Sequence, residues 1–518
     1  MRAERFTALL YRQRWTLLAL TTVHAFVLHY FVIGFPSWDG FTYRLPPVVE
    51  LVQHGDFGMT RFNQWAFVGH LPFLELANLP FLYVFKLRGL YIGVPLVVYP
   101  LCVYAVYACG RELTGDPRSA TFGAIAYAAL PMVNQQPYAG YIDFILAALI
   151  AYFVYAVLRL RTTTRPGWSF VRVVVATVLV TMSRVHALYI VVVLTPCLIY
   201  PSFCQRTRWR VTVADRRGLW RALAAIALGA APMIALQIYR FVHYGTPTYP
   251  LQFAVLGITI GNGKPALEHM RAGGVHDGSL LELGRAAIRG WIWLGRWPKI
   301  GFFDSREQGG GFVAWVAAPL LPTFVRRATR VERWLVVGCV VVSVLAHDFA
   351  IPRYAYTLVV ALVVVIGRAM PALLEGGRRH RALFWFASVV LLAHGCRPEV
   401  DLLAIHRGGF SPRLNIASSP YADQTFVPFP DIHGRFVIID GVAEGMVLPI
   451  YGADLDNEIL ETVPADALGA RCAGLAAVLA REPTALFIDD KDETRDCQRT
   501  CQFTTTTGAC RAYRIVPP

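Results

Sequence analysis

The sequence carries little charge for its length. Only 16% of its 518 residues are charged, whereas soluble globular chains average about 25%. It also lacks internal repeats, low-complexity tracts and a glycine-rich nucleotide-binding loop. These deficits accompany a hydrophobic content of 55% and a mean hydropathy of +0.46. Together they argue against a soluble enzyme and favour a membrane protein with many spans.

The chain also lacks a single basic patch, although its net charge is +15. Its arginines lie between apolar segments, in short stretches such as "RRATRVERW" and "EGGRRHR". That distribution is typical of the cytoplasmic loops of polytopic membrane proteins, which are enriched in Lys and Arg. It argues against nucleic acid as a partner.

Apolar segments long enough for membrane helices recur along most of the chain. A hydrocarbon core needs about 20 apolar residues per helix. We therefore expect a polytopic α-helical membrane protein with about 11 transmembrane helices, in the following ranges: 14–35, 89–109, 118–134, 140–160, 168–184, 186–203, 219–240, 311–325, 333–348, 353–370 and 382–397.

Arginine counts in the loops predict the orientation. Alternate loops are rich in arginine, as in "RLRTTTRPGWSFVR" and "CQRTRWRVTVADRRGLWR", whereas "NQQPYAGYID" and "DFAIPR" are nearly free of it. The first apolar segment is too long for a signal peptide and is followed by no small-residue cleavage site. We expect the N-terminus inside and, with eleven spans, the C-terminus outside.

This topology divides the chain at residue 397. Residues 1–397 form a transmembrane domain whose larger outer loops are 36–88 and 241–310. The tail 398–518 alternates strand-like and helix-like runs, such as "RFVIIDG", "AGLAAVLAREP" and "TALFIDD", and predicts a small extracytoplasmic α/β domain. Two semi-apolar stretches of the first outer loop are expected to be helices along the membrane surface, with their polar residues facing water.

Ionisable residues gather at the predicted outer ends of the spans, and the middles are almost free of charge. A single residue of this kind is ordinarily a helix cap or a snorkelling cation. Their convergence on one side is what favours a site, and a proton-driven transporter would place such groups nearer the midplane. The candidates are Asp39, Glu75, Asp143, Arg184, His186, Arg240, His243, His347, Asp348, Arg353 and Tyr354.

Carboxylates and arginines at an outer membrane surface fit sugar transfer from a lipid phosphate. One carboxylate can act as general base on an acceptor hydroxyl. The phosphate is already a good leaving group and needs only charge stabilisation, which the paired donors of arginine supply. One base and a cationic clamp suffice for transfer with inversion at the anomeric carbon.

Several motifs resemble those of GT-C fold integral-membrane glycosyltransferases, in the family-39-like group of protein O-mannosyltransferases and the lipid A aminoarabinose transferase. The first, "WDGFTYRLPPVVELVQHGDF", is similar to the group's common Asp-x-x-x-Tyr-His-Leu-Pro opening, which a surface helix follows. "LPFLELANLPF", "AGYIDFILAAL", "YGTPTYPLQF", "FFDSREQGGGFVAW" and "IPRYAY" follow in the family's order. The departures are Arg44 where His is common, Thr246 where Asn is, and Arg184 where Lys is.

The resemblance implies a role for each candidate. Asp39 and Asp143 would be catalytic, with Asp39 as the general base. Arg184, Arg353 and Arg240 would bind the donor phosphate. The substrate-binding positions would be Tyr43, Arg44, Glu75, His186 and Tyr354.

The implied partners are a polyprenyl-phosphate sugar donor, membrane lipids and a glycan, lipid or protein acceptor. The implied location is the bacterial cytoplasmic (inner) membrane, with the site facing the periplasm or exterior. No cofactor is expected and no metal ligand is assigned, although metal dependence stays open. Two alternatives share the phosphate-binding arginines: a transporter or flippase of lipid-linked sugars, and an O-antigen ligase or polymerase with a lipid diphosphate donor.

Five of the ten cysteines lie near or in the tail, which fits an oxidising compartment. Cys396 is expected to be free at the end of the last helix. The other four can form two disulfides with three possible pairings, and a zinc site is the alternative. These candidates are Cys472, Cys497, Cys501 and Cys510.

Overall fold

The computed structural model describes the following residues: 22–23, 45–55, 73–86, 94–134, 143–163, 165–184, 187–206, 211–244, 251–255, 258–260, 264–265, 312–345, 356–396, 434–439, 456–463, 475–488, 497–504 and 510–515. They fall into two compact units, which we describe separately. The bundle unit comprises Met1–Leu28, Leu96–Pro137 and Ile142–Gly408. The loop–tail unit comprises His29–Pro95, Tyr138–Tyr141 and Gly409–Pro518.

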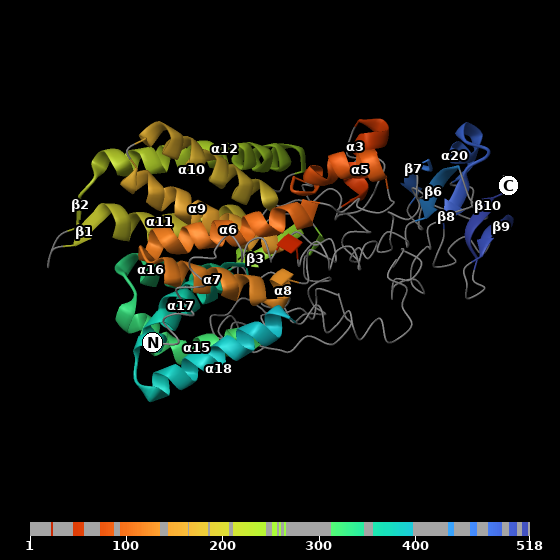
Figure 1. The fold of residues 1–518 in the computed structure, drawn as a ribbon. Helices are drawn as coiled ribbons and strands as arrows, with labels where there is room; N and C mark the ends of the chain where they lie inside the picture. The colour runs from red at the N-terminus through yellow and green to blue at the C-terminus, as the bar shows by residue number, and fades with distance from the viewer. Residues whose placement is uncertain are drawn as a thin grey trace. The chain divides into compact units, whose positions relative to one another are not determined.

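The bundle unit is built of packed helices (Figure 1). Every predicted span except the first overlaps one of them, and of 14–35 only residues 22–23 are described. The helices are α6 (Val94–Thr114), α7 (Pro117–Ala129), α8 (Pro131–Asn134), α9 (Asp143–Thr162), α10 (Pro166–Ser183), α11 (Ala187–Phe203), α12 (Arg216–Tyr244), α15 (Phe312–Arg327), α16 (Arg330–Leu345), α17 (Tyr356–Glu375) and α18 (Arg378–Gly395).

Within the described residues, four helices are long and apolar enough to cross a membrane: α9, α10, α12 and α17. The apolar helix α11 is shorter. Several helices contain proline, including α12 at Pro232 and α17 at Pro371. Proline is tolerated in membrane helices because neighbouring helices and side chains satisfy the freed backbone groups.

Local sequence explains where helices begin and end. Asp116 caps α7 by accepting hydrogen bonds from the backbone N–H groups of Arg118 and Ser119. The same helix stops at Leu130, which is extended, because a residue before proline is disfavoured in helical geometry. The predicted range 118–134 is therefore two helices, α7 and α8.

Glycines allow close packing between helices. A Cβ at Gly367 of α17 would lie 2.7 Å from the Ser119 carbonyl oxygen and 3.2 Å from Cα of Gly123, both in α7. A Cβ at Gly229 of α12 would lie 2.6 Å from Cβ of Thr177 in α10. Small residues at helix contacts are typical of membrane bundles, where close backbone approach drives association.

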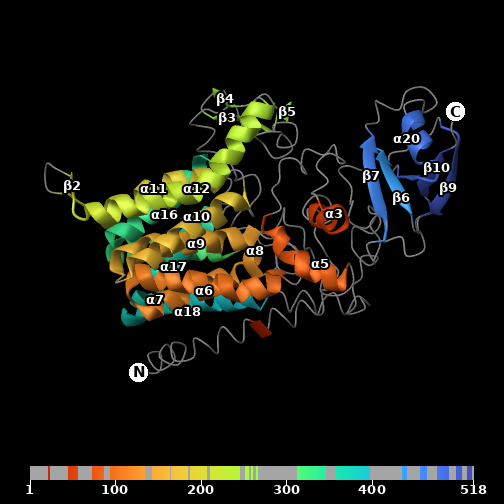
Figure 2. The same ribbon diagram turned by 90° about the horizontal axis from the view of Figure 1, so that it is seen from above.

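The bundle has two distinct ends (Figures 1 and 2). At the arginine-rich end, Arg159 of α9 pairs with Glu112 of α6 at 3.4 Å. Arg330 of α16 lies 4.5 Å from the centre of the Tyr200 ring in α11. The hairpin of β1 (Cys204–Arg206) and β2 (Val211–Val213) joins α11 to α12 at this end.

At the opposite end, α12 is followed by β3 (Leu251–Val255), β4 (Ile258–Ile260) and β5 (Lys264–Pro265), which pair in the order β4-β3-β5. Figure 2 shows this small sheet at the end away from β2.

Exposed aromatic side chains form a band at each end of the bundle. Tryptophan and tyrosine favour the two membrane–water interfaces. The rise along α12 from Trp220 to Tyr239 is about 28 Å at about 1.5 Å per residue, close to the thickness of a hydrocarbon core, about 30 Å. The arginine-rich end has Trp168, Trp220, Trp334 and Trp385, and the opposite end has Tyr189, Tyr239 and Trp315.

The loop–tail unit contains two parts that are far apart in sequence. From the first loop it has α3 (Pro46–His54), the 3₁₀ helix η2 (Glu75–Asn78) and α5 (Leu79–Phe85), and α3 packs on the other two. The helices lie where predicted, but the expected water-facing polar side is wrong. Glu50 and Glu75 are 0% and 1% exposed, because both lie on the packed sides of their helices.

The tail contributes a five-stranded sheet in the order β7-β6-β8-β10-β9. Its strands are β6 (Arg435–Ile439), β7 (Glu458–Val463), β8 (Leu486–Ile488), β9 (Arg499–Thr504) and β10 (Cys510–Ile515). β6 lies parallel to β7 and β8, whereas β10 is antiparallel to β8 and β9.

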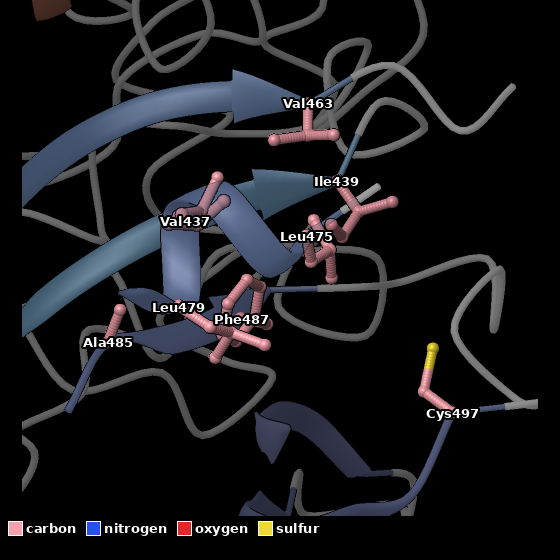
Figure 3. Close-up of a cluster of buried hydrophobic side chains, with 9 residues drawn as sticks. Val437, Ile439, Val463, Leu475, Leu479, Ala485, Phe487 and Cys497 are labelled. Carbon is pink, nitrogen blue, oxygen red and sulfur yellow. The ribbon is translucent and has the colours of Figure 1, made fainter. Parts of the chain in front are cut away.

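Helix α20 (Ala476–Arg481) packs on one face of this sheet. Val437, Ile439 and Phe487 from the strands meet Leu475 and Leu479 in the core (Figure 3). The opposite side chains of β6, Phe436 and Ile438, are buried as well. Both faces of β6 are therefore covered, and α20 accounts for one of them.

Candidate functional site

The end of the bundle opposite the arginine-rich end holds the described candidates of the bundle unit. Asp143 is the first residue of α9. This end of α9 is fixed by a 2.6 Å hydrogen bond from Tyr127 Oη, in α7, to the carbonyl oxygen of Phe144. The second predicted catalytic position is thus the first residue of a helix, and helix N-termini favour negative charge.

Arg184 follows the last residue of α10 at the same end. Its backbone is extended (φ −154°, ψ 144°) and breaks the helix. Helix α11 begins three residues later, at Ala187, whose N–H donates to the Arg184 carbonyl oxygen at 2.9 Å. Helices α10 and α11 are therefore joined by only the few residues between Ser183 and Ala187.

Arg240 lies in the last two turns of α12 and turns inward. Its side chain is 4% exposed, whereas those of its neighbours Tyr239 and Phe241 are 50% and 59% exposed. α10 and α12 both run away from the arginine-rich end and touch where Gly229 meets Thr177. Arg240 lies about 16 Å beyond that contact along α12, and Arg184 about 10 Å beyond it along α10, at about 1.5 Å per residue.

The fold thus brings Asp143, Arg184 and Arg240 to one end of the bundle unit. Buried charge at the end of a membrane bundle is costly, and it ordinarily faces the protein interior or a water-filled cavity. Guanidinium groups are donors suited to phosphate oxygens, and two arginines lie at this end of the bundle.

Sequence reasoning missed two polar features of this end. Asn134, at the end of α8, donates from Nδ2 to the carbonyl oxygen of His394 in α18 at 2.9 Å, and both residues are buried. Ser343 of α16 and Thr357 of α17 share a 2.5 Å hydrogen bond between their hydroxyl groups. In the sequence these residues differ from others only in lying at the ends of apolar runs. Many polar residues lie there without any such contact, so the sequence does not predict these hydrogen bonds.

The remaining predicted residues divide into two groups. Glu75 is described, but it belongs to the loop–tail unit, where it opens η2 and is buried. His243 is described as well, in the last turn of α12. The others lie outside the described residues: Asp39, Tyr43, Arg44, His186, His347, Asp348, Arg353 and Tyr354.

The cysteines follow the predicted division between membrane and tail. Cys497 and Cys501 are disulfide-bonded, Cys396 is free and exposed, and Cys102, Cys109 and Cys339 are free and buried in the bundle. Cys472 lies outside the described residues. No cluster of three or more His, Cys, Asp or Glu side chains suited to a metal ion occurs in the part of the chain that the structure describes.

Comparison with known proteins identifies the fold. No protein family and no curated protein matches the chain by sequence. Among solved structures, it is similar to ArnT from Cupriavidus metallidurans bound to undecaprenyl phosphate, with a TM-score of 0.53 and 12% identity over 97% of this chain and 98% of that one. The chain has the GT-C fold.

The chain is therefore a multi-pass membrane protein, as its apolar helices and aromatic bands also indicate. An oligosaccharyltransferase from Archaeoglobus fulgidus also matches, with a TM-score of 0.45 and 13% identity over 95% of this chain and 73% of that chain.

Proposed function

We propose that the protein is an inverting glycosyltransferase that moves a sugar from a polyprenyl-phosphate donor to an acceptor. The observation that carries this proposal is the fold, shared over 97% of the chain with a protein solved bound to undecaprenyl phosphate. The grouping of Asp143, Arg184 and Arg240 at one end of the bundle supports it, since such a donor presents a phosphate at the membrane surface.

In this proposal Arg184, Arg240 and Arg353 bind the donor phosphate. Arginine presents a rigid fork of donors that matches phosphate oxygens, and it stays charged at any working pH. As the bond to the anomeric carbon breaks, negative charge grows on the phosphate, and these guanidinium groups stabilise it. No protonated acid is needed to assist the leaving group.

Asp39 is the proposed general base, which removes the proton from the acceptor hydroxyl as that oxygen attacks the anomeric carbon. Asp143 is the second proposed catalytic carboxylate. The proposed substrate-binding residues are Tyr43, Arg44, Glu75, His186 and Tyr354. No residue is assigned to a metal.

The sidedness proposal follows from the two ends of the bundle. The arginine-rich end would face the cytoplasm, because cytoplasmic loops retain Lys and Arg. The end with Asp143, Arg184 and Arg240 would then face the periplasm or exterior of a bacterial inner membrane. With eleven spans the tail would lie on that side too, and the disulfide-bonded Cys497 and Cys501 support an oxidising location for it.

The experiment uses purified full-length protein in detergent, where no sidedness exists. Undecaprenyl-phosphate sugars with labelled glucose, mannose or aminoarabinose are presented with a cell-envelope extract as acceptor. We expect release of undecaprenyl phosphate together with label on the extract, at equal rates. An intact donor in detergent, combined with movement of the same lipid across proteoliposome membranes, would establish a flippase instead. Consumption of lipid diphosphate donors alone would establish a ligase or polymerase.

A further inference from the structure

The first outer loop and the tail form one compact unit, although more than 300 residues separate Pro95 from Gly409 in sequence. A direct side-chain contact joins them. Gln53 of α3 donates from Nε2 to the carbonyl oxygen of Asn457 at 2.8 Å. Helix α3 begins two residues after Arg44 and seven after Asp39, so the helix that makes this contact directly follows the segment with the proposed base.

Helix α3 is a short helix with well-defined ends, so restraining one of its ends also restrains the other. It starts with two prolines, whose fixed φ is preorganised for a first turn, and it ends at Gly55, which has the left-handed conformation (φ 77°). Its first turn, from Pro46 to Val49, is buried. The contact with Asn457 is made near the C-terminal end of the helix. Packing of the first turn therefore holds one end of α3, and the hydrogen bond from Gln53 holds the other.

Asn457 is itself firmly held in the tail sheet. It is fully buried just before β7, and its Oδ1 accepts a hydrogen bond from the Gly434 N–H at 2.9 Å. The next residue, Glu458, donates its N–H to the carbonyl oxygen of Gly434 at 3.1 Å. The carbonyl that accepts from Gln53 therefore belongs to a residue that is held by hydrogen bonds where the parallel strands β6 and β7 begin.

Charged side chains brace the same edge of the sheet. Arg435 donates from Nε to Glu458 at 2.8 Å and also pairs with Glu482, which follows α20. The hydrogen bond to Glu458 raises the pKa of Arg435, so this guanidinium stays charged. Together with the core between α20 and the sheet, these contacts make the tail a rigid support for Asn457.

We infer that the tail module positions the first outer loop, and with it the segment carrying Asp39, through the Gln53–Asn457 hydrogen bond. Gln53 is thus a positioning residue, and the tail is needed for full transferase activity. This inference rests on the proposed function for its catalytic consequence. The physical reason is that a general base must be held within hydrogen-bond reach of its proton, and a displacement of about 1 Å can cost about 100-fold in rate.

The test compares Gln53→Glu with Gln502→Glu in the full-length protein. Glutamate at 53 has the same shape but no N–H to donate, and its carboxylate repels the Asn457 carbonyl. Gln502 is an exposed β9 residue whose amide bonds only to neighbouring backbone, so its variant adds the same charge to the same unit. Gln53→Lys restores a donor and serves as the rescue variant.

Two readouts separate this inference from the proposed function. Hydrogen exchange of residues 46–55 reports the contact without any activity. We expect several-fold faster exchange there in Gln53→Glu, no change in β6–β8 or the bundle helices, and wild-type exchange in Gln502→Glu. For turnover, we expect kcat to fall at least about tenfold in Gln53→Glu, with unchanged binding of undecaprenyl phosphate and partial recovery in Gln53→Lys.

Unchanged exchange at 46–55 in Gln53→Glu would overturn the inference whatever the activity. Faster exchange with unchanged kcat would overturn the positioning role. If the wild-type protein transfers no sugar, the proposed function fails and the catalytic half of this inference fails with it, while the exchange data still decide whether the tail holds α3.

Discussion

The two ends of the helical bundle use their charges differently. At the arginine-rich end, cations meet ordinary structural partners. Arg368 donates from Nε and an Nη to the Arg327 carbonyl oxygen at 3.0 and 2.8 Å, and Arg333 donates in the same way to Ala328. Basic side chains near helix C-termini satisfy carbonyls that the helix leaves open. At the opposite end, the described cations are few, and Arg240 is buried within the last turns of a membrane helix.

At the arginine-rich end these charges support the fold, whereas at the opposite end we propose that arginines bind a phosphate. An exposed pair such as Arg118 and Glu375 adds little stability, because water competes for both groups. A buried arginine costs free energy to desolvate, and it persists where it has a partner or a ligand. Substitutions at the two ends should therefore fail in different ways: lost activity at one, lost stability at the other.

The largest expected effect is on catalysis, from Arg240→Gln. We expect kcat/KM for the polyprenyl-phosphate donor to fall about 100-fold, as when a donor to developing charge is removed. Arg240→Lys should lose less, because it keeps the charge but not the forked geometry. Initial rates of donor consumption measure both, with size-exclusion profiles to establish folding.

The matched control is Arg159→Gln at the arginine-rich end, which breaks the Glu112 pair and should leave kcat/KM within twofold. Equal losses in Arg159→Gln and Arg240→Gln would abolish the proposed distinction between the ends.

A smaller effect, on stability, is expected from Gly367→Ala in α17. The new Cβ would press on the Ser119 carbonyl oxygen and on Cα of Gly123, which belong to backbone and cannot rotate away. Overpacking of this kind costs about 1–3 kcal/mol. Thermal unfolding followed by tryptophan fluorescence should show a lower midpoint, with kcat per folded molecule unchanged.

Gly167→Ala in the first turn of α10 is the control, because nothing lies within 4 Å of the added Cβ. An unfolding midpoint of Gly367→Ala equal to that of wild type would mean that α7 and α17 do not pack as described.

The smallest effect is expected from Glu332→Gln at the arginine-rich end. The buried carboxylate accepts the Thr329 N–H, while Thr329 Oγ1 accepts the Glu332 N–H, which makes a capping box at the start of α16. It also lies 3.7 Å from Arg368 Nε. We expect a loss of about 1 kcal/mol, seen as a lower unfolding midpoint. Glu375→Gln, in the exposed pair with Arg118, should leave the unfolding midpoint unchanged. A larger drop in the midpoint for Glu375→Gln than for Glu332→Gln would contradict the stabilising role given to Glu332.

The bundle was largely predictable because apolar runs report helices directly. The ranges 140–160 and 353–370 match α9 and α17 to within a few residues. The burial of Glu50 and Glu75 was not predictable, because it depends on how the first loop folds into a unit with a tail more than 300 residues away. Amphipathic spacing predicts that a helix has an apolar and a polar face, but it does not predict whether another part of the chain packs on the polar face.

The candidate site was predictable only as a set of residues at one membrane surface. Alternating apolar segments place Asp143, Arg184 and Arg240 at the same end, because successive helices reverse direction. The burial of Arg240 between two exposed neighbours depends on which face of α12 packs against the bundle, and the apolar runs of the sequence do not give that face. Asn134 and His394 meet through a backbone carbonyl, and no residue-type pattern reports a contact of that kind.

The central claim is that this chain transfers a sugar from a lipid phosphate with Asp39 as the base, and one substitution tests it most directly. Purified Asp39→Asn is compared with wild type for release of undecaprenyl phosphate from its labelled sugar conjugate and for binding of undecaprenyl phosphate alone. The account predicts that transfer falls by at least about 100-fold, while binding and folding are unchanged. Transfer at the wild-type rate in the folded variant would contradict it.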